Sequence, residues 1–464
     1  MNVHFIAIGG SAMHNLALAL HHKGYTVSGS DDEINEPSRT RLSNAGILPA
    51  EIGWFTEKIN SSLDAIILGM HARADNPELL KAQELNLKVY SYPEYLYEQS
   101  KNKIRVVIGG SHGKTTITAM ILHVLKQCNK SFDFMVGAQL EGFDTMVSLS
   151  HDAPVMILEG DEYLSSPIDR RPKFHLYHAN IALISGIAWD HINVFPTFEN
   201  YVEQFKIFVN QMEDGGSLIY CEEDLEAKKI GEGASSSIKK FPYHIPKYEI
   251  KDGVTYLLTA DSQPLTVLSV FGHHNLLNLQ GAYLVCKQLG VADEEFYYSI
   301  QSFKGASKRL ELVGRSHELV VYKDFAHSPS KLKATTDAVH EQFTNRKLIA
   351  CMELHTFSSL NEDFLEQYKG TMDKADEAIV YFNPHTIEHK KLKPISIEQV
   401  RSAFARNDIK VFNDSALLQE CLQQKNYKQD VLLLMSSGNF DGININEFGK
   451  ALIAKTSHIS PLIP

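Results

Sequence analysis

Short apolar runs alternate with longer amphipathic stretches along the whole chain, and this rhythm constrains the fold more than any other feature. Helix-like segments, such as residues 12–23 and 115–127, directly follow glycine-containing turns. Apolar runs of strand length separated by helices indicate mostly parallel β-sheets covered by helices, so we predict an α/β fold. The apolar runs are residues 3–8, 65–68, 105–108, 155–158, 181–185, 320–322, 348–352, 378–381 and 431–435.

The chain is long enough to build several hydrophobic cores. It has 464 residues, of which 44% are hydrophobic, and a typical domain size of about 150 residues predicts three domains. A polar stretch at residues 98–103 suggests one boundary, and a segment rich in Gly, Ser and Lys at residues 302–312 suggests another. We predict domains at residues 1–100, 101–311 and 312–464.

The charge balance argues against two classes of partner. With 45 Lys and Arg against 56 Asp and Glu, the formal net charge is −11, which disfavours binding to nucleic acid or to an anionic membrane surface. We see no secretory leader and no apolar run near the ~18 residues of a membrane span, so we expect a cytoplasmic protein. The cysteines form no C-x-x-C pair that would suggest zinc or redox chemistry; they are Cys128, Cys221, Cys286, Cys351 and Cys421.

The most specific motif is a glycine-rich loop at residues 109–116, GGSHGKTT, between an apolar run and an apolar-periodic helix. Small residues let backbone N–H groups surround phosphate oxygens, Lys114 adds a positive charge, and the Thr115 hydroxyl can ligate Mg²⁺. Ile108 stands where the usual pattern has its first glycine, so the loop is a shortened variant. We predict binding of a nucleoside triphosphate by Gly110, Ser111, His112, Gly113, Lys114, Thr115 and Thr116.

A second glycine turn lies near the N-terminus, at residues 8–13, IGGSAM. Two glycines allow a tight turn that points a helix N-terminus at a diphosphate, and Asp31, about 20 residues on, can meet a ribose or a base. The third glycine of the dinucleotide pattern is missing. These residues alone fit a uridine nucleotide and an NAD-binding domain equally well, and a purely structural turn is the third possibility.

Acidic residues follow the apolar run at residues 155–158. Glu159 ends a predicted strand beside the phosphate loop, which is where Mg²⁺ should bind. The alternative for Glu159, and more so for Asp161 and Glu162, is a solvated acidic loop. His191, after the next apolar run, would by itself more often be a packed core histidine than a ligand.

The phosphate loop resembles the ATP loop of the Mur ligases, G-[ST]-H-G-K-T-T, and further motifs resemble the family in the same order. These are the glycine turn at residues 8–13, SGSD at 28–31, DNPE at 75–78, EGDEY at 159–163, GIAWDH at 186–191, GHHNLLN at 272–278, SKRLE at 307–311 and KDFAHSPS at 323–330. The resemblance spans essentially the whole chain. It implies three domains: an N-terminal Rossmann-like UDP-binding domain, a central P-loop ATPase-like domain and a C-terminal Rossmann-like domain.

The resemblance also implies roles for individual residues. A uridine nucleotide would be held by Gly9, Gly10, Ser11, Ala12, Met13, Ser30 and Asp31. The DNPE run would position the loop near this site. Mg²⁺ would be bound by Thr115 and Glu159, with His191 at a second ion, although Gly186 and Ala188 replace the Asn and Glu of the family motif. The adenine edge would be read by His274 and Asn275. Catalytic roles would fall to Lys114, His191, Arg309, Asp324 and His327, while Ser328 replaces a second histidine.

The implied reaction is an ATP-dependent, Mg²⁺-dependent amide ligation. The carboxylate of UDP-N-acetylmuramate would be activated as an acyl phosphate and captured by an amine. An NAD-dependent oxidoreductase and a non-catalytic nucleotide-binding regulator are the alternatives from other classes, and the ordered Mg²⁺ and arginine motifs favour the ligase.

Two amine donors fit this family. EGDEY at residues 159–163 with DRRPKF at 169–174, and SSGNFDG at 436–442, resemble the branch that adds the tripeptide L-alanyl-γ-D-glutamyl-meso-diaminopimelate in peptidoglycan recycling. The branch that adds L-alanine has different patterns there. ELHT at 353–356, where the amine site is expected, departs from both. We predict the tripeptide, with L-alanine as the alternative.

Overall fold

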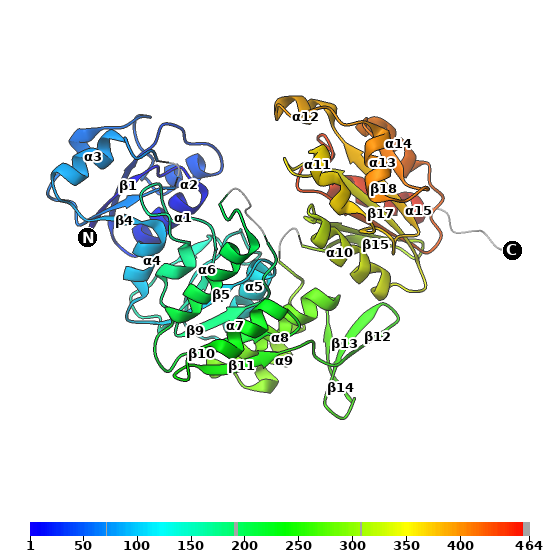
Figure 1. The fold of residues 1–464 in the computed structure, drawn as a ribbon, viewed down its shortest axis with the longest axis horizontal. Helices are drawn as coiled ribbons and strands as arrows, with labels where there is room; N and C mark the ends of the chain where they lie inside the picture. The colour runs from blue at the N-terminus through cyan, green and yellow to red at the C-terminus, as the bar shows by residue number, and fades with distance from the viewer. Residues whose placement is uncertain (71, 190–193, 307–308, 458–464) are drawn as a thin grey trace. The chain divides into compact units, whose positions relative to one another are not determined.

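The computed structural model describes residues 1–70, 72–189, 194–306 and 309–457 (Figure 1). It contains three mainly parallel sheets with helices between their strands, which confirms the α/β fold expected from the alternating apolar runs. The chain forms two compact units, Met1–Pro246 with Leu277–Ile300 and Lys247–Leu276 with Gln301–Pro464. The domain ranges 1–100, 101–311 and 312–464 remain our proposal.

The N-terminal sheet is fully parallel, with strand order β2-β1-β3-β4. Its core contains a buried hydrogen bond between two side chains, in which His4 Nε2 lies 3.2 Å from Glu78 Oε2. The other oxygen of Glu78 accepts from Phe55 N at 2.7 Å, and Asn76 caps the helix on which Glu78 lies. The DNPE run therefore anchors this helix to the sheet. The elements are β1 (Asn2–Ile6), α1 (Ser11–His22), β2 (Thr26–Ser30), α2 (Ser38–Asn44), η1 (Thr56–Lys58), β3 (Ala65–Leu68), α3 (Pro77–Glu84), β4 (Val89–Ser91) and α4 (Tyr92–Ser100).

The central sheet has seven strands in the order β11-β10-β9-β5-β8-β6-β7, and only β6 and β7 pair antiparallel. The middle strand, β5, pairs with β8 and β9, so the loops at the carboxyl ends of these three strands meet at one edge. The elements are β5 (Ile104–Gly109), α5 (Lys114–Gln127), β6 (Asp133–Met135), β7 (Val147–Ser148), β8 (Val155–Glu159), η2 (Lys173–Leu176), β9 (Ile181–Ile184), α6 (Phe198–Asn210), β10 (Ser217–Cys221), α7 (Leu225–Gly233), β11 (Lys239–Tyr243), α8 (His273–Gln288) and α9 (Asp293–Ile300).

A buried arginine organises the junction between these two sheets. Arg105, on β5, is only 3% exposed. Its Nη1 donates to the carbonyl oxygens of Ser100, Lys101 and Lys103, at 3.1, 2.9 and 3.3 Å. Its Nη2 donates to Glu213 Oε1 at 2.7 Å. The polar stretch after α4 is thus fixed by hydrogen bonds to one guanidinium group.

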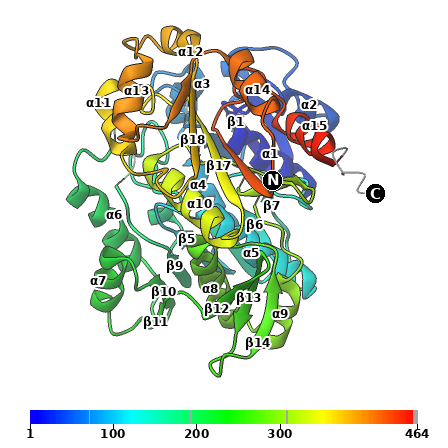
Figure 2. The same ribbon diagram turned by 90° about the vertical axis from the view of Figure 1, so that its right-hand side faces the viewer.

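The second unit contains a six-stranded sheet of order β15-β16-β20-β17-β18-β19, parallel except for β15. Figure 2 shows it between α10, α11 and α13 on one side and α14 and α15 on the other, and two separate apolar clusters fill the two faces. The elements are β15 (Glu311–Arg315), β16 (Leu319–Asp324), α10 (Pro329–Gln342), β17 (Lys347–Leu354), α11 (Glu362–Leu365), η3 (Glu366–Tyr368), β18 (Glu377–Phe382), α12 (Pro384–His389), α13 (Ile397–Phe404), β19 (Lys410–Phe412), α14 (Ser415–Gln423), β20 (Asp430–Met435) and α15 (Ile445–Ser457).

A small antiparallel sheet belongs to the same unit. It consists of β12 (Tyr248–Lys251), β13 (Val254–Leu258) and β14 (Pro264–Leu268). Thr255 Oγ1 donates to Gln342 Oε1 at 2.8 Å, and the Tyr248 hydroxyl donates to Glu341 Oε1 at 2.6 Å, so α10 holds the sheet. Across the described residues of the whole chain, no helix is both long and apolar enough to span a membrane.

Candidate functional site

The phosphate loop connects β5 to α5, as the sequence predicts. Gly110 and Gly113 have φ angles of 132° and 81°, which side chains rarely tolerate. A Cβ on Gly110 would overlap Ser185 Oγ, and one on Gly113 would overlap Asn278 Oδ1, so both positions also lack space for a side chain. Gly113 is the N-cap of α5 and supplies no side-chain cap. The first turn of α5 therefore presents backbone N–H groups, which suits a phosphate.

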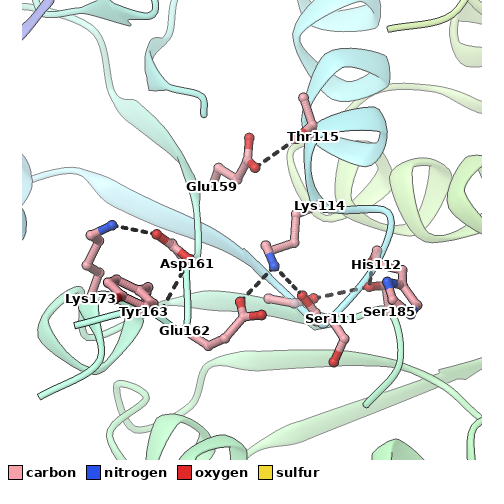
Figure 3. A network of polar contacts seen from close by, with 12 residues as sticks. Ser111, His112, Lys114, Thr115, Glu159, Asp161, Glu162, Tyr163, Lys173 and Ser185 are labelled. Carbon is pink, nitrogen blue, oxygen red and sulfur yellow. Dashed lines mark hydrogen bonds and ion pairs between the residues drawn. The ribbon is translucent and has the colours of Figure 1, made fainter. Parts of the chain in front are cut away.

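Lys114 lies in this loop with two acceptors. Its Nζ donates to Gly110 O at 2.6 Å and to Glu162 Oε2 at 2.7 Å (Figure 3). Burial alone would lower the pKa of the ammonium group, but the charges of Glu162 and Asp161 outweigh burial, and the pKa lies above its ordinary value. Lys114 therefore keeps its charge at neutral pH.

Glu159 and Thr115, the two residues predicted to bind Mg²⁺, are brought together. Thr115 Oγ1 donates to Glu159 Oε1 at 2.8 Å, and Gly137 N donates to Glu159 Oε2 at 2.8 Å. Burial raises the pKa of Glu159, against the opposing effects of Gly137 and Lys114. One carboxylate and one hydroxyl fit Mg²⁺, which takes few protein ligands beside phosphate and water oxygens. His191 lies outside the described residues, and within those residues no group of three or more His, Cys, Asp or Glu suits a metal ion.

The two acidic residues after Glu159 differ in burial: Glu162 is buried, and the Asp161 side chain is partly exposed. Glu162 is 1% exposed, so the interpretation as a solvated loop is wrong for it, and Asp161 forms an ion pair with Lys173 at 2.5 Å. The segment from residue 161 to 174 closes into a hairpin, with Leu164 bridged to Pro172. Within the two runs that resemble the tripeptide-adding branch, Asp161 pairs with Lys173 and Asp169 pairs with Arg171.

The N-terminal glycine turn is shaped by the carboxylate predicted to face a nucleotide. Gly9 N donates to Asp31 Oδ2 at 2.6 Å, and a Cβ on Gly9 would lie 2.9 Å from that oxygen. Burial raises the pKa of Asp31, against the hydrogen bond from Gly9. The other residues predicted for this site differ in exposure: Ser11 and Ala12 are exposed, Gly10 is half-buried, and Met13 and Ser30 are buried.

The remaining predicted nucleotide residues lie in the second unit. Asn275 Nδ2 donates to Phe271 O at 2.9 Å, and His274 is half-buried on the first turn of α8. Arg309 lies over the ring of Phe325, 5.5 Å from its centroid. His327 Nδ1 lies 2.8 Å from Phe325 O.

Asp324, at the end of β16, holds Leu310 beside the start and the first turns of α10. Its Oδ2 accepts from Leu310 N at 2.5 Å, and its Oδ1 accepts from Ala326 N at 2.7 Å and Thr335 Oγ1 at 3.2 Å. Burial raises the pKa of this carboxyl, against the bond from Leu310 and the charge of Arg309. Asp324 is therefore placed to orient the backbone beside Arg309.

Another buried carboxylate lies near the end of β17, in the ELHT segment. Glu353 is 2% exposed, and its Oε2 accepts from Phe440 N at 2.9 Å and from Ser436 Oγ. Its Oε1 lies 3.6 Å from His355 Nδ1, and a Cβ on Gly438 would lie 2.8 Å from Oε2. The loop after β20 is thus built directly onto Glu353.

Sequence reasoning missed several contacts of the phosphate loop. Ser185 Oγ donates to His112 O, and the Tyr201 hydroxyl lies 2.9 Å from Ser111 Oγ. Asn278 contacts Gly113, and it could have been found as the last residue of the GHHNLLN motif. Ser185 could also have been found, because it directly follows β9, and β9 pairs with the strand that leads into the phosphate loop. No local pattern marks Tyr201, which lies in the first turn of α6.

Comparison with known proteins accounts for the three mainly parallel sheets. Residues 2–103 match the Mur ligase family, catalytic domain; residues 108–286 match the Mur ligase middle domain; and residues 308–438 match the Mur ligase, glutamate ligase domain. The chain belongs to the Mur ligase family. It is an ATP-dependent ligase that forms amide bonds, which confirms the reaction class implied by the motifs over the oxidoreductase and regulator alternatives.

Two curated Mur ligases illustrate the similarity in sequence. A UDP-N-acetylmuramate–L-alanine ligase of Sulfurihydrogenibium sp. (strain YO3AOP1) is 29% identical over 444 residues, which cover 94% of this chain and 95% of the relative. The ligase of the same name from Clostridium kluyveri is 30% identical over 391 residues, 82% of each chain.

Two solved Mur ligases share the fold. MurC of Thermotoga maritima has a TM-score of 0.68 at 19% identity and covers 99% of this chain and 100% of its own. The murein peptide ligase Mpl of Psychrobacter arcticus 273-4 has a TM-score of 0.60 at 22% identity, with 100% of both chains covered. At these identities the two structures establish the fold and do not select a substrate.

Proposed function

We propose that this Mur ligase joins the carboxylate of UDP-N-acetylmuramate to the amine of L-alanyl-γ-D-glutamyl-meso-diaminopimelate. The carboxylate oxygen attacks the γ-phosphorus of ATP, the bond to ADP breaks, and an acyl phosphate forms. The amine nitrogen then attacks the acyl carbon, phosphate leaves, the amine loses a proton, and the amide remains.

The 2.8 Å contact between Thr115 and Glu159, beside the Lys114 ammonium, carries the activation half of this proposal. We assign the ATP phosphates to the backbone of residues 110–116 and to Lys114, because that segment combines helix N–H groups with a charged side chain. Thr115 and Glu159 would hold Mg²⁺, which supplies charge neutralisation when bound. Arg309 would add a planar charged fork for the transferring group, and His191 a ligand for a second ion.

Both candidate donors offer the same nucleophile, the α-amine of an L-alanyl residue. They differ only at the carboxyl side of that residue, where the tripeptide carries two more residues and L-alanine carries none. The donor must therefore be chosen by the surroundings of the amine site rather than by the chemistry of the attack. We place this site at Glu353 and His355, because a carboxylate attracts an ammonium group and an adjacent histidine can accept its proton.

Support for the tripeptide comes from the loop after β20. Residues 436–442 resemble the tripeptide-adding branch, and Ser436 and Phe440 of this loop bond directly to Glu353. The branch-specific sequence is therefore part of the proposed amine site. L-alanine remains the second candidate, because the curated relatives at 29% and 30% identity are L-alanine ligases.

The deciding experiment measures ADP release with Mg-ATP and UDP-N-acetylmuramate, while either L-alanine or the tripeptide is varied. We expect a higher kcat/KM for the tripeptide. A preference for free L-alanine would overturn the donor assignment, and no stimulation by either donor would overturn the proposed reaction. Glu353→Gln should raise KM for the donor and leave KM for ATP unchanged.

A further inference from the structure

We propose that Glu162 is a positioning residue that holds the Lys114 ammonium while the nucleotide site is empty and releases it to the phosphates when ATP binds. The proposal rests on ATP binding by the phosphate loop, as in the proposed function. Glu162 is then a competitor of the nucleotide for the same positive charge.

The first step of the argument is where the Lys114 ammonium points. Its Nζ is 2.7 Å from Glu162 Oε2 and 2.6 Å from Gly110 O, so two of its three donors are directed at the protein. Glu162 is almost completely buried, whereas the Lys114 side chain is 15% exposed. The lysine can therefore move toward a ligand more readily than the carboxylate can.

The second step is the anchor of Glu162. Its other oxygen accepts from the Tyr201 hydroxyl at 2.9 Å, and Tyr201 is fully buried on α6 among aromatic rings. Because the carboxylate only accepts, the Tyr201 O–H is committed to Glu162 and its oxygen accepts from Ser111 Oγ at 2.9 Å. Ser111 Oγ in turn accepts from Ala188 N at 2.9 Å. A chain of hydrogen bonds thus fixes Glu162 between the phosphate loop and the loop after β9.

The third step is the consequence for affinity. When Lys114 turns to a phosphate, Glu162 stays in place and gives up a charge-assisted hydrogen bond in a site with little water. Such a bond contributes on the order of a tenfold factor or more in an equilibrium constant. Glu162 therefore weakens nucleotide binding and takes the ammonium back when product leaves.

Isothermal titration calorimetry of full-length protein with ATP and with ADP tests this directly, alongside steady-state kinetics. We expect Glu162→Gln to bind ADP about tenfold more tightly than wild type. Its kcat and its KM for ATP should fall together, because product leaves more slowly. Glu162→Asp keeps the negative charge. Its ADP affinity and its kcat should therefore lie closer to the wild-type values than those of Glu162→Gln.

Asp161→Asn is the matched control. It removes one negative charge from the neighbouring position, but Asp161 bonds to Lys173 instead of Lys114, so ADP affinity should change much less. Tyr201→Phe keeps the ring and removes one hydrogen bond that holds the Glu162 carboxylate in place, so its ADP affinity should lie between those of wild type and Glu162→Gln.

Unchanged or weaker ADP binding in Glu162→Gln would overturn the proposal, as would an equal gain in Asp161→Asn. If Glu162→Gln does not fold, the Tyr201→Phe titration decides, with unchanged affinity counting against the proposal. Failure of the wild type to bind ATP or ADP is a different result, because it would overturn the assignment of the phosphate loop itself.

Discussion

Replacement of Gly113 by alanine tests the phosphate loop at its tightest point. Gly113 has a φ of 81°, and an added Cβ would overlap Asn278 Oδ1 and lie 3.1 Å from Asn278 Cγ. A left-handed backbone costs an L-residue about 1–2 kcal/mol. Displacing the buried Asn278 adds an overpacking cost of about 1–3 kcal/mol. We expect a total loss of about 2–5 kcal/mol from the free energy of unfolding.

The assay is thermal unfolding of four proteins: wild type, Gly113→Ala, Asn278→Ala and the double variant. Asn278→Ala removes the atom that the new methyl would strike, so the double variant should be more stable than the sum of the single effects predicts, by about 1–3 kcal/mol. For a domain of 150–250 residues, each kcal/mol corresponds to a shift in Tm of about 2–4 °C. Strictly additive effects would refute the overlap, and an unchanged Tm in Gly113→Ala would refute both parts of the reasoning.

Further predictions concern the charged residues. Lys114→Ala should abolish activity, because it removes the ammonium group of the loop, while the protein still unfolds cooperatively; undiminished turnover would contradict this. Glu159→Ala should raise the Mg²⁺ concentration needed for half-maximal activity, and a Mg²⁺ titration identical to that of wild type would return Glu159 to a structural role. Arg309→Lys should lower kcat, measured by ADP release, because a bidentate fork becomes a point charge. Burial would raise the pKa of Glu78, but bonds from His4 and Ser30 outweigh it and hold the pKa below its ordinary 4.5. The stability that Glu78 contributes is therefore present above pH 4.5 and lost as the pH falls below it, so Tm should fall less steeply below pH 4.5 in Glu78→Gln than in wild type.

The sequence predicted the fold well because its signals are local. Each apolar run of strand length became a strand, and the glycine pattern at residues 109–116 specified a turn that only small residues can form. The pairing of Thr115 with Glu159 was also predictable, since parallel strands β5 and β8 are neighbours and end at the same edge.

Contacts between distant segments could not be predicted from the sequence. Tyr201 reaches Ser111 and Glu162 from the first turn of α6, and an aromatic residue at helical spacing normally indicates only core packing. The sequence left open whether Glu162 lies in a solvated acidic loop, because its burial depends on the hairpin formed by residues 161–174. Glu353 could not be singled out from the sequence, because the loop after β20 that bonds to it is distant along the chain.

Hydrogen bonds from Arg105 make the connection between the N-terminal sheet and the central sheet rigid. The polar residues before β5 resemble a flexible linker, yet the carbonyl groups of Ser100, at the end of α4, and of Lys101 and Lys103 accept from the guanidinium of Arg105 on β5. A break between residues 103 and 104, directly before β5, would part Arg105 from all three of these acceptors, at a cost of about 1–3 kcal/mol for each group left unsatisfied. The N-terminal sheet and the central sheet should therefore resist separation by limited proteolysis. In chimaeras made from two Mur ligases, proteins that take the N-terminal sheet and the central sheet from the same parent should be more stable than those that join them from different parents.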